Sequence, residues 1–173
     1  MPKTLSLIRH AKSSWKFPGL DDPDRPLNSR GTRDAPLMAA RYAQGCAPEL
    51  IVSSFANRAL TTARTFAHCL GYPVERLQLS ERIYEAGPEQ LIQAIALVDQ
   101  DPEHVALFGH NPGLTMLCNG LCGAELDNIP TAGFVVLELP CDVWSELPGL
   151  WNTHRGELLE FDYPKKNLGE ARR

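Results

Sequence analysis

The stretch that most constrains the fold lies near the start of the chain and reads Leu5-Ser6-Leu7-Ile8-Arg9-His10-Ala11-Lys12. Its first half is a short apolar run, which predicts a buried β-strand. The run ends at Arg9 and His10, two side chains that carry nitrogen donors. Ligands of open α/β sheets bind outside the carboxyl ends of the strands. We therefore expect this first strand to present its polar end to a ligand site.

Short apolar runs alternate with helical patterns along the rest of the chain. Further strands are predicted at 50–52, 77–79, 105–108, 134–137 and 158–161, the last of them at a sheet edge. Helices are predicted at 30–43 with Ser29 as N-cap, at 57–70, from Pro88 to Val98, and from Pro112 onward. This order predicts an α/β fold, a three-layer α/β/α sandwich around a mostly parallel sheet.

The segment from Trp15 to Asn28 follows neither the helical nor the strand period. It contains three prolines and three aspartates, namely Pro18, Pro23, Pro26, Asp21, Asp22 and Asp24. Such a composition predicts an irregular loop. The aspartates could form a cation site, but a solvated loop is the simpler interpretation.

The composition limits the classes of function. A length of 173 residues is typical of one domain, which we place at 1–164, followed by a charged tail at 165–173. With 17 Lys and Arg against 21 Asp and Glu, the net charge is −4, which disfavours nucleic-acid and membrane partners. The five cysteines form no paired CxxC spacings, and we recognise neither a secretory leader nor a membrane-length apolar run. We expect a soluble, cytoplasmic protein.

Three of the predicted strands end in polar clusters that could meet at one edge of the sheet. The first ends in Arg9-His10, the second is followed by Ser53-Ser54 and Arg58, and a later one runs into Gly109-His110-Asn111. Arginine forks bind phosphate oxygens in bidentate fashion and stay charged at any relevant pH. A neutral histidine can attack phosphorus when a hydrogen bond fixes its tautomer. The set therefore predicts a site for a phosphoryl group.

Other residues and motifs do not compete with this interpretation. His68, His104 and His154 are expected at the surface or in packing, and Cys118 and Cys122 are better explained as small buried residues than as metal ligands. No cysteine is followed six residues later by arginine, and no GxxxxGK[ST] or GxSxG motif occurs. Other common phosphate-handling and hydrolase motifs are therefore missing.

The motifs together resemble the histidine phosphatase superfamily, which includes the phosphoglycerate mutases. Residues 7–12 resemble its RHG-type signature, with Ala11 in place of glycine as in the small SixA-type phosphohistidine phosphatases. Four more segments resemble that branch, at 24–27 with Gly31, 53–63, 109–113 and 130–133. The resemblance implies a phosphoglycerate mutase-like fold. It covers about residues 3–138, with Phe55 and Leu60-Thr61 departing from the usual pattern beside the site.

The resemblance also implies roles for individual residues. His10 would be the phosphorylated nucleophile, Arg9 and Arg58 would hold phosphate, and His110 would hydrogen-bond the phosphoryl group. Asn111 and, by its position, Arg25 would also contact the substrate. Glu81 lies in a segment similar to the acid-bearing segment of the mutases, which makes it a candidate general acid; Glu85 is a second candidate, and both could equally be surface residues. No metal or other cofactor is implied.

The short chain between residues 64 and 110 leaves no room for a capping subdomain, so we expect an open site. Trp15 and Phe17 could line its rim or pack against the core. An open site favours a phosphoprotein surface over an enclosed sugar phosphate, and we expect a phosphohistidine on a phosphotransfer or signalling protein as the substrate. Its imidazole leaving group needs little protonation, so such an enzyme could work without either glutamate. The alternatives are a small phosphomonoester substrate, a mutase, or a phosphoprotein-binding module without catalysis.

Overall fold

The structure is a computed structural model, and it describes residues 1–166. The charged tail predicted at 165–173 therefore lies outside the described residues from position 167 on. None of the helices in the described part of the chain is long and apolar enough to cross a membrane.

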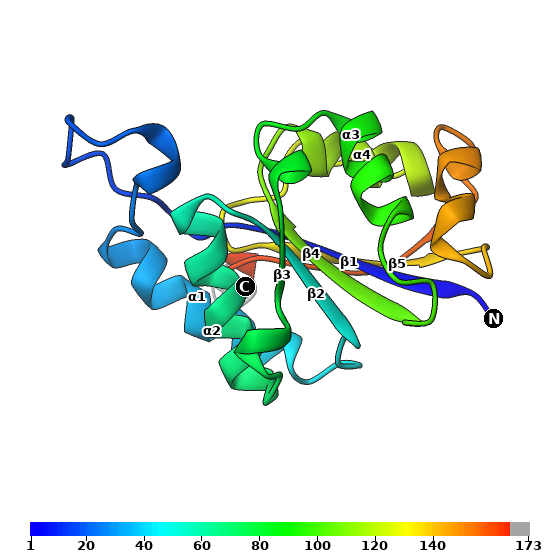
Figure 1. Cartoon of the computed structure of the whole chain (residues 1–173), viewed down its shortest axis with the longest axis horizontal. Coiled ribbons are helices and arrows are strands. Elements are labelled where there is room, and N and C mark those ends of the chain that lie inside the picture. The colour runs from blue at the N-terminus through cyan, green and yellow to red at the C-terminus, as the bar shows by residue number, and fades with distance from the viewer. Residues whose placement is uncertain (167–173) are drawn as a thin grey trace, which may run out of the picture.

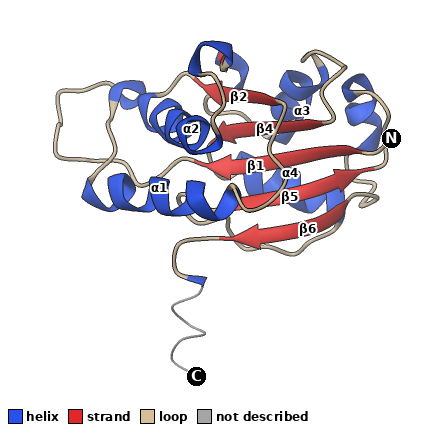
Figure 2. Cartoon of the chain, turned by 90° about the horizontal axis from the view of Figure 1, so that it is seen from below, coloured by secondary structure: helices blue, strands red, loops and turns tan. Residues whose placement is uncertain are grey.

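A six-stranded sheet forms the centre of the fold (Figures 1 and 2). Its strands are β1 (Lys3–Arg9), β2 (Leu50–Ser54), β3 (Gln78–Ser80), β4 (His104–Gly109), β5 (Phe134–Leu139) and β6 (Glu157–Asp162). They lie in the order β3-β2-β4-β1-β5-β6. The pairs from β3 to β1 are parallel, whereas β5 runs antiparallel to both β1 and β6. The mostly parallel sheet and the edge position of the last strand are thus confirmed.

Within residues 1–166, four α-helices cover the two faces of the sheet. α1 (Ser29–Tyr42) and α2 (Asn57–Leu70) pack on one face, and α3 (Pro88–Ala96) and α4 (Gly113–Cys122) pack on the other (Figure 1). Short 3₁₀ helices are η1 (Asp22–Asp24), η2 (Val74–Arg76), η3 (Glu81–Ile83) and η4 (Trp144–Leu150). The predicted three-layer α/β/α sandwich is confirmed.

Each face of the sheet has its own apolar core, because successive strand residues point to opposite faces. In β1, Leu5 and Leu7 belong to the core under α3 and α4, whereas Ile8 belongs to the core under α1 and α2. Both cores are fully buried around this strand. β1 is therefore held from both sides, which fixes the position of the residues that follow its carboxyl end.

The start of α1 packs against the loop that follows β1. The predicted N-cap, Ser29, is wrong by one residue: the cap is Asn28, whose side-chain oxygen accepts a hydrogen bond of 2.8 Å from the backbone N–H of Gly31. Asn28 also donates its backbone N–H to the carbonyl of Lys12. A Cβ at Gly31 would lie 2.2 Å from that carbonyl oxygen, so only glycine permits so close an approach.

The segment between Ser13 and Asn28 is irregular, as predicted, apart from η1 and an isolated bridge between Ser13 and Leu27. It projects beyond the carboxyl ends of the parallel strands (Figures 1 and 2). We call residues 15–25 the projecting loop.

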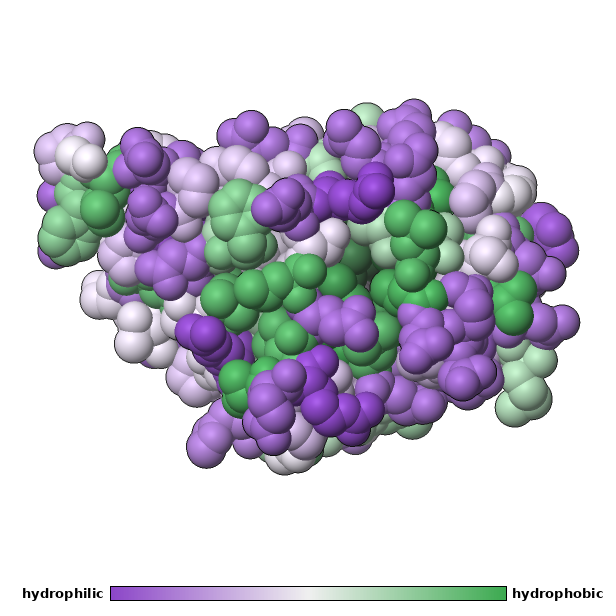
Figure 3. Space-filling model, in the orientation of Figure 1, coloured by the Kyte–Doolittle hydropathy of each residue, from purple (hydrophilic) through white to green (hydrophobic). Residues whose placement is uncertain are grey.

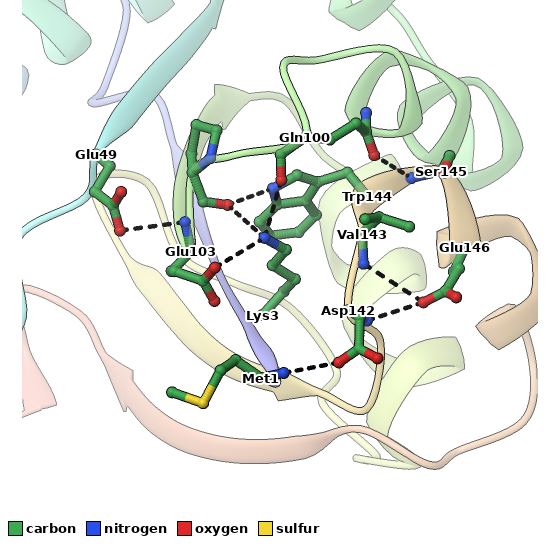
Figure 4. Close-up of polar contacts among 11 residues, drawn as sticks. Met1, Lys3, Glu49, Gln100, Glu103, Asp142, Val143, Trp144, Ser145 and Glu146 are labelled. Atoms are coloured by element: carbon green, nitrogen blue, oxygen red, sulfur yellow. Dashed lines mark hydrogen bonds and ion pairs between the residues drawn. The ribbon is translucent and has the colours of Figure 1, made fainter.

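A polar cluster around Lys3 lies at the amino ends of β1 and β4, opposite the carboxyl ends of the parallel strands (Figure 4). The buried Lys3 Nζ donates to the carbonyls of Gln100 and Pro102 at 3.0 and 3.1 Å and contacts the carboxylate of Glu103 at 3.2 Å. Trp144 donates its indole N–H to the same Pro102 carbonyl at 2.7 Å. The Lys3 ammonium group uses all three of its donors in these contacts. The cluster therefore ties η4 to the start of β1 and β4, and Lys3 has a structural role.

Candidate active site

The carboxyl ends of β1, β2 and β4 meet, because these strands are neighbours in the parallel part of the sheet. His10 follows β1, Ser54 ends β2, and His110 follows β4. The backbone N–H of His10 donates to the carbonyl of Gly109 at 3.1 Å, and the His10 and His110 ring centroids are 5.2 Å apart. The structure therefore brings together the clusters that the sequence placed at one sheet edge.

His10 is held in one orientation with one ring nitrogen available. Its Nδ1–H donates to the carbonyl of Ala11 at 2.7 Å, and within the described residues its Nε2 forms no hydrogen bond. Burial disfavours the imidazolium, the nearby guanidinium groups of Arg58 and Arg9 add to this, and together they lower the pKa of His10 to about 4. At neutral pH His10 is a neutral imidazole whose Nε2 carries a lone pair, which is the state a nucleophile needs.

His110 lies beside His10 and is oriented by the end of β2. Its Nε2 is 2.8 Å from the hydroxyl oxygen of Ser54, which also accepts the backbone N–H of Ala56. The Ser54 hydroxyl can donate to Nε2 while its oxygen accepts from Ala56, and in that arrangement the ring proton of His110 is on Nδ1. The His110 Nδ1 is buried and has no partner among the described residues, and burial lowers the pKa of His110 to about 3. It offers a neutral donor next to the nucleophile.

Arg9 is anchored by the loop before β5. One terminal nitrogen, Nη1, donates to the carbonyl of Ile129 at 3.0 Å and to the side chain of Asn128 at 3.3 Å, while its buried Nε has no partner among the described residues. The Asn111 amide donates to the same two acceptors, and its oxygen accepts from Thr115. Asn111 thus orders the loop that holds Arg9, and its predicted contact with substrate stays a prediction.

Arg58, in the first turn of α2, is paired with the projecting loop. Its Nη1 donates to the Asp22 carbonyl at 2.9 Å, and its Nη2 contacts the Asp22 carboxylate at 3.0 Å. The Tyr84 hydroxyl donates to the same carboxylate at 2.6 Å, and this bond, followed by the charge of Arg58, lowers the pKa of Asp22. The ionised carboxylate of Asp22 is therefore bound to the guanidinium group of Arg58, which was predicted to hold phosphate.

Asp22 is the site residue that the sequence analysis missed, since it was interpreted as part of a solvated loop. Its neighbours Asp21 and Asp24 are indeed exposed. Arg25 lies near Asp22 as well: its Nε is 3.5 Å from the carboxylate, and its guanidinium stacks on the Trp15 ring at 4.0 Å. No sequence signal distinguishes Asp22 from its neighbours, because its role comes from contacts made across the fold.

The carboxyl groups proposed as proton donors lie outside the phosphate cavity. Glu81 and Glu85 are exposed and line a separate cavity of about 310 Å³ together with Tyr84. Tyr84 adjoins both cavities, because its ring is 5.6 Å from that of His110 and its hydroxyl reaches Asp22. The assignment of Glu81 as a general acid stays a prediction.

The site as a whole is a small and open cavity of about 190 Å³ at the sheet edge. The side chains that define its chemistry are Arg9, His10, Trp15, Asp22, Arg58 and Thr131. Among the described residues, no group of three or more His, Cys, Asp or Glu side chains is placed to hold a metal ion. The cavity instead presents two arginines and the neutral His10, behind which the His110 ring packs, a set suited to a tetrahedral dianion.

The remaining histidines and the paired cysteines have packing or surface positions. His104 is buried and shares hydrogen bonds with Ser6 and Tyr42, whereas His68 and His154 are exposed. Cys118 and Cys122 lie 3.9 Å apart, sulfur to sulfur, on α4.

Comparisons with known proteins agree with this geometry. The family "Histidine phosphatase superfamily (branch 1)" matches residues 5–87. An uncharacterized protein from Mycobacterium leprae is 30% identical over 173 residues, which cover 91% of this chain and 100% of that protein. A SixA protein from Agrobacterium tumefaciens, assigned as a phosphohistidine phosphatase, is 28% identical and superposes with a TM-score of 0.78 over 95% of this chain and 99% of that chain. A protein histidine phosphatase SixA complexed with tungstate, 22% identical with a TM-score of 0.74 and covering 95% and 99%, shares the fold.

The chain belongs to the histidine phosphatase superfamily, in its SixA-type branch. Its fold is the phosphoglycerate mutase-like α/β fold expected from the motifs. The SixA-type relatives are named as phosphatases, and the polar set around His10 fits that activity.

Proposed function

We propose that this protein is a metal-independent phosphatase that works through a phosphorylated His10, and that its substrate is a phosphohistidine on another protein. The observation that carries the proposal is the state of His10: neutral, with its Nδ1 tied to the Ala11 carbonyl at 2.7 Å and its Nε2 free. A cytoplasmic location stays a prediction.

In the first step, the lone pair of His10 Nε2 attacks phosphorus, and the bond from phosphorus to the leaving group breaks. The proton stays on Nδ1, which goes on donating its hydrogen bond to the Ala11 carbonyl, so the product is a phosphohistidine whose positive charge is shared across the ring. Arg9 Nε and His110 Nδ1, which have no partner among the described residues, can bind the phosphoryl oxygens, and Arg58 can join them when the dianion shares or displaces the Asp22 carboxylate. The charge of these oxygens spreads in the transition state.

In the second step, water attacks the phosphorus of phospho-His10, the P–N bond breaks, and inorganic phosphate is released. The water loses one proton during this attack. Asp22 is an ionised carboxylate that lines the cavity, and it can accept that proton directly or through a second water. His10 returns to its neutral form with the electron pair of the broken P–N bond on Nε2, and Asp22 releases its proton to solvent, which restores the site.

The arginines supply the positive charge that a metal ion would otherwise bring to the phosphoryl oxygens. Phosphohistidine is favoured as the substrate for two reasons. Its imidazole leaving group departs with little help, since an unperturbed histidine has a pKa near ~6.5. The cavity is also too small and open to enclose the organic part of a metabolite, whereas it admits a phosphoryl group presented on a protein surface.

A small-molecule phosphomonoesterase is the second candidate function, because the open cavity also admits small aryl phosphates. A phosphoprotein-binding module without catalysis is disfavoured by the free Nε2 of His10, which a binding module does not need. Substrates with alkoxide leaving groups need a proton donor. We propose Glu81 as this general acid, with Glu85 as the alternative.

The experiment that tests the proposal replaces the nucleophile. His10→Ala should abolish the turnover of 4-nitrophenyl phosphate and of a phosphohistidine peptide, and it should abolish the acid-labile phosphoenzyme found in the wild type. A chelator should leave the wild-type rate unchanged.

His68→Ala is the matched control, because it removes an exposed histidine in the last turn of α2, at the end of the helix opposite to Arg58. It should keep the wild-type rate. More than a trace of activity in His10→Ala, with a circular dichroism spectrum like that of the wild type, would refute the proposed mechanism.

A further inference from the structure

Large apolar side chains are exposed around the phosphate cavity. Trp15, which lines the cavity, is 66% exposed, and Phe17 and Leu20 farther along the projecting loop are 50% and 38% exposed. Phe55, which follows β2 on the other side, is 39% exposed. Scattered single apolar residues are normal on a surface, but several next to one ligand site mark an interaction surface. We call these four residues the apolar rim.

The projecting loop holds its apolar side chains away from both cores. Phe17 and Leu20 are joined by a turn in which Leu20 donates its backbone N–H to the Phe17 carbonyl at 3.1 Å. Neither residue belongs to a core cluster or packs against one. Figure 3 shows hydrophobic surface on this part of the molecule, at the upper left of the view. These side chains do not stabilise the core, so their exposure calls for another explanation.

The two sides of the apolar rim are tied together through the phosphate site. Phe55 packs on Tyr84 with ring centroids 5.1 Å apart, and Tyr84 donates to Asp22. On the other side, the Trp15 ring stacks on Arg25, whose Nε is 3.5 Å from the Asp22 carboxylate. Asn57 also donates to the Asp24 carbonyl at 3.3 Å. The rim and the phosphate-binding Arg58 are therefore parts of one connected structure.

The surroundings of the rim decide what covers it. A small phosphomonoester inside the cavity cannot reach Phe17 or Leu20, which lie outside its lining. An anionic membrane is disfavoured, because the exposed Asp21 and Asp24 outweigh the exposed Lys16 on the same loop. The rim is continuous with the phosphate cavity through Trp15, so a protein that presents a phosphoryl group to His10 would also lie over the rim.

We infer that the apolar rim is the docking surface for the folded protein that carries the phosphohistidine, with apolar residues of that protein covering Phe17 and Leu20 beside the modified histidine. This inference rests on the proposed function and deepens it by naming the substrate as a protein surface. Aromatic and aliphatic anchors next to a polar centre are typical of protein interfaces.

The test compares one phosphohistidine in two settings. The first substrate is a folded helical phosphotransfer domain phosphorylated on histidine, and the second is a short peptide with the same residues around the phosphohistidine. The variant is the double substitution Phe17→Ser with Leu20→Ser. Its matched control is Leu97→Ser, which replaces a 68% exposed leucine at the end of α3, away from the catalytic edge.

We expect the wild type to prefer the folded domain over the peptide by at least about tenfold in kcat/KM. The double variant should lose that preference through a higher KM for the domain, while its rates on the peptide and on 4-nitrophenyl phosphate stay within about twofold of wild type. Leu97→Ser should behave like the wild type throughout.

Other outcomes overturn the inference in distinguishable ways. A wild type that turns over 4-nitrophenyl phosphate but neither phosphohistidine substrate refutes the proposed substrate. A wild type without preference for the folded domain, or a double variant that keeps it, refutes the docking surface alone. A double variant that changes only the sedimentation of the protein, or its binding to anionic vesicles, assigns the rim to self-association or to a membrane instead.

Discussion

At the scale of single residues, the contact that most affects the chemistry is the one between Asp22 and Arg58. In the free site the Asp22 carboxylate holds Nη2, and the Asp22 carbonyl holds Nη1. A phosphoryl dianion that binds Arg58 must share or displace the carboxylate. The carboxylate thus keeps Arg58 oriented but repels the ligand, and both effects act at the same guanidinium.

Asp22→Asn should strengthen the inhibition by inorganic phosphate about fivefold. The substitution keeps the shape of the side chain and removes one negative charge within a few ångströms of the bound dianion. Because Asp22 is partly exposed, the repulsion is that of a water-like medium, about 1 kcal/mol. The inhibition constant for phosphate against 4-nitrophenyl phosphate measures this effect.

Asp101→Asn is the control for that measurement, since it removes the same charge from an exposed position before β4, at the opposite edge of the sheet. Its inhibition constant should match the wild type. Weaker phosphate inhibition in Asp22→Asn would mean that orienting Arg58 matters more than the repulsion.

Glu81 is tested by the dependence of its effect on the leaving group. If it is the general acid, Glu81→Gln should slow phosphoenzyme formation from alkyl phosphates by about two orders of magnitude. The same change should barely affect nitrophenyl phosphate or a phosphohistidine peptide, whose leaving groups need little protonation. Pre-steady-state release of the leaving group isolates this step from the later hydrolysis of phospho-His10.

Glu85→Gln serves as the comparison, because both glutamates line the same neighbouring cavity. An equal loss of rate on every substrate would show that Glu81 binds substrate or supports the structure. No loss on any substrate would identify it as a surface residue.

At the scale of elements, local patterns predict the helices and strands because their signals are local. α2 is observed at the predicted residues 57–70, since Gly71 adopts the left-handed conformation that ends a helix, at φ +68°, and Pro73 follows. The N-cap of α1 was misplaced by one residue, because Asn28 and Ser29 are both good capping residues and only the packing against Lys12 decides between them.

The residues of the candidate site also fall into those that local patterns predict and those that only long-range contacts place. Arg9, His10, Arg58 and His110 follow strands or begin a helix, so the sequence could place them at one sheet edge. Asp22 and Tyr84 lie 62 residues apart in segments without a regular period, and their hydrogen bond to each other exists only in the folded chain. Residues whose role depends on such long-range contacts could not be found from local pattern alone.

At the scale of the whole molecule, the fold buries three histidines in their neutral form. His10, His104 and His110 are 9%, 6% and 9% exposed. Burial lowers their pKa values to about 4, about 4 and about 3 respectively. Two of them serve the phosphate site, and the third lies in the core contacts of α1. Both the nucleophile and the stability of the fold therefore depend on histidines that stay neutral.

The sign of that dependence follows from proton linkage. In the unfolded chain each of the three histidines takes up a proton near pH ~6.5, whereas in the folded chain it stays neutral to about pH 4 or below. The unfolded state binds more protons between these values, so stability is complete above pH ~6.5 and falls as the pH falls toward 4. For His104 alone, the loss of unfolding free energy from pH 7 to pH 5 is on the order of 2 kcal/mol.

Urea unfolding of the wild type and of His104→Gln at both pH values measures this loss. The variant should lose about 2 kcal/mol less than the wild type between pH 7 and pH 5. His68→Gln, a substitution at an exposed position, should lose as much as the wild type. An equal loss in His104→Gln and the wild type would show that His104 is not kept neutral by the fold.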